Sequence, residues 1–125
     1  MKKILLIEDE KVLAEMYKEK LILAGFEVIL SPESEEGLKL AKKEKPDLII
    51  LDILLPRANG IYFLTQLRKI KDPKVSSIPV IAFSNFDDPE TKLQVKKFGV
   101  KDYLIKTNYT PQEIVEKVKD YFKQV

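Results

Sequence analysis

The sequence predicts an α/β fold in which helices cover both faces of a doubly wound parallel sheet of five strands. Short apolar runs alternate with longer stretches of helical periodicity, which is the rhythm of repeated strand–helix units. The run at residues 48–51 is apolar at every position, as expected for a parallel strand covered on both faces. Turn and cap residues separate these segments, and right-handed crossovers between such units produce a parallel sheet.

The first two strands are predicted at residues 4–7 and 26–30, and each is followed by a helix. The first helix ends at Ala24-Gly25, and its apolar face is predicted to contain Val12, Leu13, Met16, Tyr17 and Leu21. The second helix starts within residues 31–34, where Pro32 and nearby acids suit a helix N-terminus. Its apolar side carries Leu38, Leu40 and Ala41, and Gly37 lowers its helix propensity slightly.

The third strand, residues 48–51, ends on Asp52, and a loop at residues 56–60 leads into the third helix. The apolar positions of this helix are Phe63, Leu64 and Leu67. Residues 79–83 are predicted to form the fourth strand. Asp87 or Asp88 before Pro89 indicates the start of the fourth helix, which ends at Gly99.

The fifth strand is predicted at residues 103–105, and a capping box at residues 110–113 starts the last helix. That helix is predicted to bury Ile114, Val115, Val118, Tyr121 and Phe122. Five strands alternating with five helices favour the flavodoxin-like strand order 2-1-3-4-5, in a three-layer sandwich. We expect residues 1–125 to form one domain, with no output domain after it.

Composition limits the chemistry available to the chain. The 22 basic and 20 acidic residues give a net charge of +2, so neither a membrane nor a nucleic acid partner is expected. The apolar run after Lys3 is too short for a signal peptide or a membrane span, which favours a cytoplasmic protein. Cysteine and histidine are both absent. Chemistry must therefore use carboxylates, hydroxyls and lysine.

Polar residues follow the predicted strands at the edge where an open parallel sheet places its site. The first strand is followed by Glu8-Asp9-Glu10, the third ends in Asp52, the fourth in Ser84 and the fifth in Lys106. Clustered carboxylates repel one another unless a cation lies among them, and oxygen ligands favour Mg²⁺. A metal, a lysine and a hydroxyl facing a carboxylate suit phosphoryl transfer to Asp52. Separately, each has a simpler role: Asp9 or Glu10 as a helix cap, Ser84 as a turn residue, Lys106 as a surface lysine.

These residues make the chain resemble response-regulator receiver domains over essentially its whole length. The resemblance implies that Asp52 is the phosphoacceptor and that Glu8, Asp9, Asp52 and the backbone carbonyl of Leu54 hold Mg²⁺. It also implies that Lys106 and Ser84 assist the transfer and that Tyr103 moves inward with Ser84 on phosphorylation. Such a domain is a signalling protein, not an enzyme with a separate substrate, although it catalyses its own phosphotransfer and autodephosphorylation.

The resemblance also implies partners. A sensor histidine kinase or a histidine phosphotransfer protein would donate the phosphoryl group. A downstream protein would bind the face formed by the helix that starts at Pro89, the strand at residues 103–105 and the last helix.

Two positions depart from the family pattern, and two others bear on the lifetime of the phosphoryl group. Thr107 stands where the family has a proline preceded by a cis peptide bond. A cis bond before a residue other than proline costs about 3 kcal/mol. We therefore expect a trans Lys106–Thr107 bond and a different placement of Lys106. Asn85 is larger than the usual residue after the serine, and it either narrows access to Asp52 or hydrogen-bonds the phosphoryl group. The resemblance implies that Leu54 and Phe86, two residues after Asp52 and Ser84, flank the approach of water to the phosphorus. Because both are apolar, they predict slow hydrolysis unless Phe86 points away from the site.

Three alternatives compete with this interpretation. A haloacid-dehalogenase-type phosphatase would need a second aspartate where the chain has Leu54. A flavodoxin-type flavin module would need a phosphate loop where Glu8-Asp9-Glu10 would repel a phosphate. A degenerate receiver that only binds proteins, independently of phosphorylation, ranks second, and it rests on Thr107 and Asn85.

Overall fold

The computed structural model describes residues 1–55 and 59–124, and it contains one parallel sheet of five strands in the order β2-β1-β3-β4-β5. The strands are β1 (Lys3–Ile7), β2 (Glu27–Ser31), β3 (Leu48–Asp52), β4 (Val80–Ser84) and β5 (Asp102–Ile105). The helices are α1 (Lys11–Leu23), α2 (Ser34–Glu44), α3 (Gly60–Lys69), α4 (Pro73–Ser76), α5 (Pro89–Lys96) and α6 (Pro111–Gln124). The predicted flavodoxin-like fold and strand order are confirmed. The loop predicted at residues 56–60 lies largely outside the described residues.

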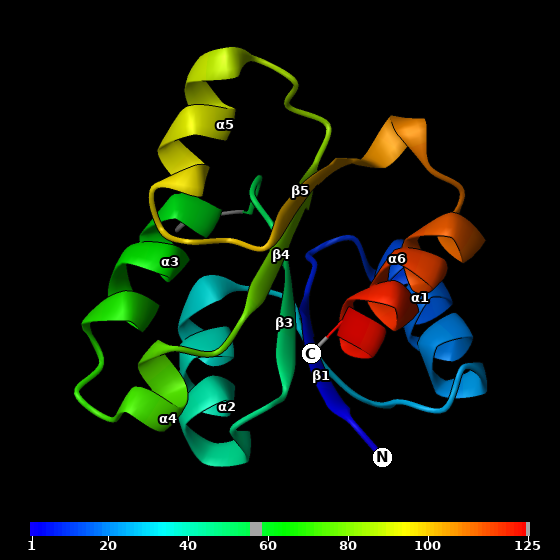
Figure 1. The fold of residues 1–125 in the computed structure, drawn as a ribbon, viewed down its shortest axis with the longest axis horizontal. Helices are drawn as coiled ribbons and strands as arrows, with labels where there is room; N and C mark the ends of the chain where they lie inside the picture. Colours follow the sequence, from blue (N-terminus) through cyan, green and yellow to red (C-terminus); the bar gives the residue numbers. More distant parts are fainter. Residues whose placement is uncertain (56–58, 125) are drawn as a thin grey trace.

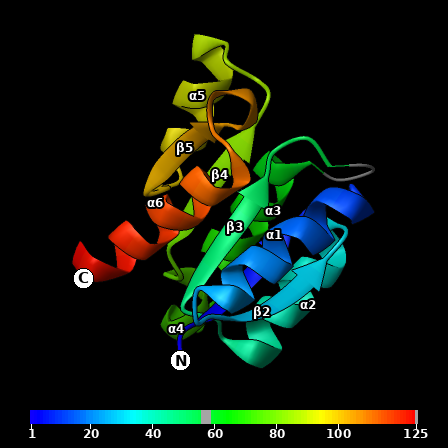
Figure 2. The same ribbon diagram turned by 90° about the vertical axis from the view of Figure 1, so that its right-hand side faces the viewer.

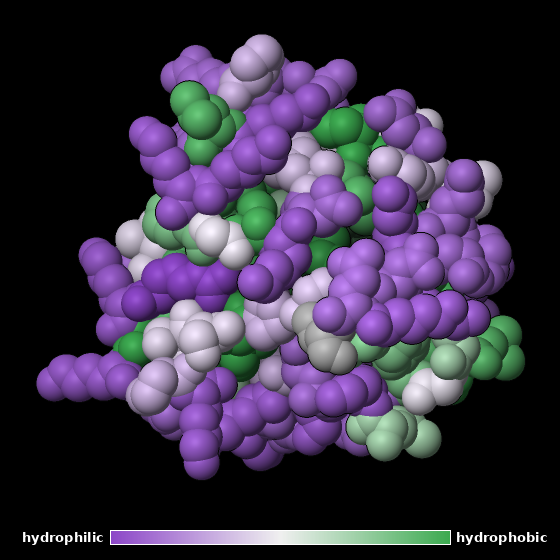
Figure 3. Space-filling view, viewed as in Figure 1, coloured by the Kyte–Doolittle hydropathy of each residue, from purple (hydrophilic) through white to green (hydrophobic). Residues whose placement is uncertain are grey.

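The helices form two layers, one on each face of the sheet. Helices α1 and α6 lie on one side and α2, α3, α4 and α5 on the other (Figure 1). In Figure 2, which looks onto the first of these layers, α1 and α6 lie in front of the strands. Each layer encloses its own apolar core: Phe83 belongs to the core under α1 and α6, and Phe63 to the core under the other helices. The outer surface in the view of Figure 1 is largely hydrophilic, with hydrophobic residues appearing as small separate areas (Figure 3).

Several helix signals in the sequence are confirmed. Asp88, rather than Asp87, caps α5, because its carboxylate accepts the Thr91 amide at 2.9 Å. The capping box of α6 is complete: the Glu113 amide donates to the Thr110 hydroxyl at 3.1 Å, and the Thr110 amide donates to the Glu113 carboxylate at 2.8 Å. These contacts satisfy amide groups that the first turn of a helix leaves without partners.

Several details differ from the sequence prediction. The described chain has a short additional helix, α4, whose single turn is too brief to show helical periodicity. Val12 is 82% exposed, because the buried stripe of α1 runs through Ala14, Tyr17 and Leu21, and Val12 lies 200° around the helix from Ala14. The first and fifth strands begin one residue earlier than predicted, and the second and fourth strands each begin and end one residue later. Tyr121 and Phe122 are only partly buried.

Gly37 has a packing role that its helix propensity does not reveal. A Cβ atom at this position would lie 2.7 Å from Cδ1 of Ile7 and 3.3 Å from the ring of Phe63. The absence of a side chain therefore lets α2 approach β1 closely. None of the described helices is long and apolar enough to cross a membrane.

Candidate functional site

The predicted site residues meet at the carboxyl edge of the sheet. Asp52 is the last residue of β3 and Ser84 the last of β4, while Glu8 directly follows β1 and Lys106 directly follows β5. Because β1, β3, β4 and β5 are consecutive neighbours in the sheet, these four strand ends lie side by side. The parallel arrangement therefore brings together residues that are 98 positions apart in the sequence.

The Lys106 ammonium lies between two buried carboxylates. Its Nζ is 2.7 Å from Oε1 of Glu8 and 3.0 Å from Oδ2 of Asp52. The side chains of Glu8 and Asp52 are 1% and 5% exposed, and that of Lys106 is 13% exposed. Backbone amides occupy the other carboxylate oxygens: Glu10 donates to Oε2 of Glu8 at 3.2 Å, and Leu54 donates to Oδ1 of Asp52 at 3.1 Å. Such charge-assisted contacts hold both carboxylates in fixed orientations.

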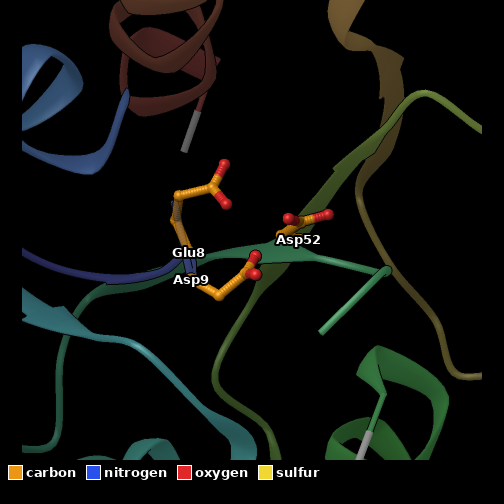
Figure 4. A group of neighbouring side chains, drawn as sticks. All are labelled: Glu8, Asp9 and Asp52. Atoms are coloured by element: carbon orange, nitrogen blue, oxygen red, sulfur yellow. The ribbon is translucent and has the colours of Figure 1, made fainter. Parts of the chain in front are cut away.

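Asp9 completes a cluster of three carboxylates. One oxygen from each of Glu8, Asp9 and Asp52 lies within 4.8 Å of the others. Figure 4 shows these groups converging from the ends of β1 and β3. Asp9 is exposed, and Glu10 rather than Asp9 occupies the N-cap position of α1, without a side-chain cap bond. Three hard oxygen donors at this spacing fit a divalent cation such as Mg²⁺.

The electrostatics of the cluster follow from burial and crowding. Burial raises the pKa of the Glu8 carboxyl, and the charge of Asp52 adds to this effect, while Lys106 opposes it. Partial desolvation and the proximity of Glu8 raise the pKa of the exposed Asp9 carboxyl. Burial disfavours the charge of Lys106, but its hydrogen bond to Glu8 and the charge of Asp52 outweigh burial, so the pKa of the ammonium is raised. The site therefore carries an excess of negative charge that a cation would neutralise.

The carboxylates open into a cavity of about 450 Å³, and the residues predicted to control access line it. Leu54 and Phe86 are 59% and 40% exposed, and Asn85 is also exposed. Ser84 lines the same cavity but is 1% exposed. Phe86 thus lies at the mouth of the site, as the predicted role in water access requires.

Tyr103 and Ser84 are connected through the backbone of Phe86. The Phe86 amide donates to Oγ of Ser84 at 3.1 Å, and the Tyr103 hydroxyl donates to the Phe86 carbonyl at 2.9 Å. Tyr103 is partly buried against the core under α2 to α5, and burial raises the pKa of its hydroxyl. The two residues predicted to act as a switch are therefore joined by a short chain of hydrogen bonds.

The departure at Thr107 does not displace Lys106. The described residues contain no cis peptide bond, and residues 106–108 form a single 3-10 turn directly after β5. Lys106 nevertheless reaches both Glu8 and Asp52. The expected trans bond is confirmed, and the expected displacement of Lys106 from its partners is not observed.

Sequence reasoning missed one contact of the site. The Lys106 ammonium lies over the ring of Phe83, 4.7 Å from its centroid. Phe83 reads as an ordinary apolar residue of the fourth strand, and no motif distinguishes it. Its position opposite Asp52 becomes apparent only from the register of β3 and β4.

The parallel five-stranded sheet, with acids, a serine and a lysine at these strand ends, has the pattern on which the resemblance to receiver domains rests. The family model for the response regulator receiver domain matches residues 4–119. The chain therefore belongs to the response-regulator receiver family, a class of signalling modules of two-component systems.

Individual relatives agree with this assignment. The chain is 36% identical over 118 residues to the alkaline phosphatase synthesis transcriptional regulatory protein PhoP of Bacillus subtilis, covering 94% of this chain and 47% of PhoP. It is 37% identical over 108 residues to protein PilH of Pseudomonas aeruginosa, covering 85% of this chain and 86% of PilH. The chain thus spans about half the length of PhoP but most of PilH.

Solved structures show the same fold. The receiver domain of the Francisella response regulator 1452 is 30% identical and superimposes with a TM-score of 0.86, covering 99% of this chain and 98% of that one. Chemotaxis protein CheY4 of Vibrio cholerae is 26% identical, with a TM-score of 0.86 and coverage of 96% and 98%.

Proposed function

We propose that Asp52 accepts a phosphoryl group from a sensor histidine kinase or a histidine phosphotransfer protein, and that this modification changes a protein-binding surface. One observation carries the proposal: the Lys106 ammonium contacts both Glu8 and Asp52 at the floor of an open cavity. A purely structural ion pair has no need of a cavity beside it, whereas a phosphoacceptor must be reached by its donor.

In the proposed reaction, a carboxylate oxygen of Asp52 attacks the phosphorus of the donor. A new O–P bond forms while the donor's bond to phosphorus breaks, and the leaving group keeps the electron pair of that bond. Lys106 balances the negative charge of the transferring group, and Ser84 donates a hydroxyl hydrogen bond to it. Leu54 and Phe86 limit the access of water, which slows the later hydrolysis.

Glu8, Asp9 and Asp52 would hold Mg²⁺ together with the backbone carbonyl of Leu54. The three carboxylates provide the oxygen donors that this ion prefers, at a spacing that suits one ion. When bound, the ion would neutralise charge on the carboxylates and on the oxygens of the phosphoryl group.

Receiver domains interact with phosphoryl donors and with downstream targets. We propose that the target of this chain binds the face formed by α5, β5 and α6, which corresponds to the predicted face. Tyr103 on β5 would link that face to the site through Phe86 and Ser84. Asn85, which is exposed and lines the cavity, would narrow access to Asp52 or bind the phosphoryl group.

Incubation with acetyl phosphate and Mg²⁺, followed by intact-mass measurement, tests the proposal. We expect a single phosphoryl adduct that is absent in Asp52→Asn and after chelation with EDTA. Asp120→Asn is the matched control, because Asp120 is an exposed aspartate on α6 far from the strand ends that form the site. An adduct that persisted in Asp52→Asn would refute the assignment of Asp52. No adduct in the parent would favour the degenerate receiver that binds proteins independently of phosphorylation.

A further inference from the structure

Phe83 lies directly beside the proposed phosphoacceptor. The strand register pairs Phe83 of β4 with Asp52 of β3 on one side and with Leu104 of β5 on the other. Side chains at paired positions point to the same face of a sheet, so the ring of Phe83 and the carboxylate of Asp52 share the α1–α6 face. Phe83 is 1% exposed and belongs to the core on that face.

Lys106 must cross β4 to reach its partners. It follows β5, whereas Asp52 ends β3, and β4 lies between these two strands. Two strand spacings amount to about 10 Å. The lysine side chain therefore runs over β4, and its ammonium lies over the Phe83 ring, 4.7 Å from the centroid. The aromatic ring forms the surface on which the ammonium rests.

A second aromatic side chain fixes the orientation of that ring. Tyr17 of α1, which is 5% exposed, contacts Phe83 edge to face, with ring centroids 5.6 Å apart and an interplanar angle of 75°. This is a favoured geometry for an aromatic pair. The contact with Tyr17 limits reorientation of the Phe83 ring, and the negative charge density of the ring face attracts the ammonium.

Glu8 and Asp52 do not by themselves fix a lysine. The four-carbon stem of lysine is flexible, and its ammonium is a point charge that can contact carboxylates from many directions. The Phe83 ring restricts these directions, because it lies beneath the ammonium while the two carboxylates lie at 2.7 and 3.0 Å. Three groups from three different strand ends thus define one position for the charge.

We propose that Phe83, supported by Tyr17, is a positioning residue whose aromatic face holds the Lys106 ammonium between Glu8 and Asp52. The proposal rests on the proposed function, since it assigns Phe83 a role in the transfer to Asp52. Phe83 acts only through Lys106 and contacts no reacting atom.

Fluorinated phenylalanines at position 83 test this role without emptying the core. Replacement by 4-fluoro-, 3,5-difluoro- and 3,4,5-trifluorophenylalanine keeps the ring nearly the same size and weakens the negative charge of its face stepwise. We expect the Mg²⁺-dependent rate of phosphorylation by acetyl phosphate to fall with each fluorine, by about 5- to 30-fold in total. The melting temperature should stay close to that of the parent, because a merely structural role would be preserved.

A spectroscopic measurement reports the placement of Lys106 independently of phosphorylation. In the metal-free protein, the ε-methylene protons of Lys106 should resonate upfield, because the adjacent Nζ lies over the Phe83 ring, 4.7 Å from its centroid. Phe83→Leu should remove this shift. Phe63→Leu is the matched control: Phe63 is also fully buried but lies in the core on the opposite face of the sheet, so the shift should remain.

Failure of this proposal is distinct from failure of the proposed function. If the parent is phosphorylated on Asp52 and the trifluoro protein reacts at the same rate, the positioning role of Phe83 is refuted. An unshifted Lys106 ε-methylene resonance in the parent would also refute it. If the parent forms no adduct on Asp52, the proposed function itself is refuted, whatever the position of the lysine resonance.

Discussion

Removing the charge of Asp9 should stabilise the metal-free protein and weaken its response to Mg²⁺. Lys106 already pairs with Glu8 and Asp52, but Asp9 adds a third carboxylate within 4.8 Å of them. Two unit charges at that separation repel by about 3 kcal/mol at an effective dielectric constant of 20. Since Asp9 is exposed, solvent screening and the charge of Lys106 reduce the net gain in Asp9→Asn to about 1 kcal/mol.

These energies translate into melting temperatures. For a chain of 125 residues, 1 kcal/mol corresponds to about 4 °C, so metal-free Asp9→Asn should melt about 4 °C above the parent. Mg²⁺ at one hundred times its dissociation constant should stabilise the parent by about 2.7 kcal/mol, or about 10 °C. The same Mg²⁺ concentration should raise the melting temperature of Asp9→Asn much less, because one ligand of the ion is missing.

Circular dichroism melts at constant ionic strength measure both effects, with EDTA and with increasing Mg²⁺. Glu10→Gln is the control, because Glu10 is exposed in the same turn but lies outside the carboxylate cluster. It should change neither the metal-free melt nor the response to Mg²⁺. The reasoning is refuted if Asp9→Asn melts below the parent in EDTA and gains as much from Mg²⁺ as the parent does.

Three further predictions follow from the same structure. Phosphorylated Leu54→Asn, Phe86→Glu should lose its phosphoryl group clearly faster than the parent once the donor is removed, and equal decay would show that these side chains do not control water. The pKa of Glu8 is raised above its ordinary value of 4.5 in the folded protein, so the contribution of Glu8 to metal-free stability should decline as pH rises through the raised pKa. Over the same pH range, the increase in melting temperature caused by Mg²⁺ should grow. A Mg²⁺-induced increase that did not depend on pH would contradict this prediction. Gly37→Ala should lower the free energy of unfolding, measured in urea melts, by about 1–2 kcal/mol, because the cost of overpacking against Ile7 exceeds the gain in helix propensity. A stabilised variant would show that Ile7 moves aside to accommodate the added methyl group.

The sequence predicted which residues meet at the carboxyl edge of the sheet, because strand ends in a parallel sheet have fixed positions relative to one another. Once the strand order was inferred, Glu8, Asp52, Ser84 and Lys106 had to meet at one edge. The contact between Lys106 and Phe83 could not be predicted, since it depends on the register of neighbouring strands and on the path of one side chain.

The helix α4 was missed although Asp72 caps it and Pro73 occupies its first position, because a single turn shows no helical periodicity. The Arg68 guanidinium donates to the backbone carbonyls of Ser76, Ile78 and Phe98 at 2.8–2.9 Å. These carbonyls belong to α4, to the segment before β4 and to the segment before β5. A local sequence pattern carries no information about an arginine that joins the segment around α4 to the segment before β5.

The link between Ser84 and Tyr103 has a consequence for how such a domain can change. Between the hydroxyls of Ser84 and Tyr103, residue 86 contributes only its backbone amide and carbonyl. Every amino acid except proline provides both groups. The same residue lines the cavity, where its side chain is proposed to control hydrolysis. Mutation at this position can therefore lengthen or shorten the duration of a signal while leaving its transmission intact, so these two properties are free to evolve independently.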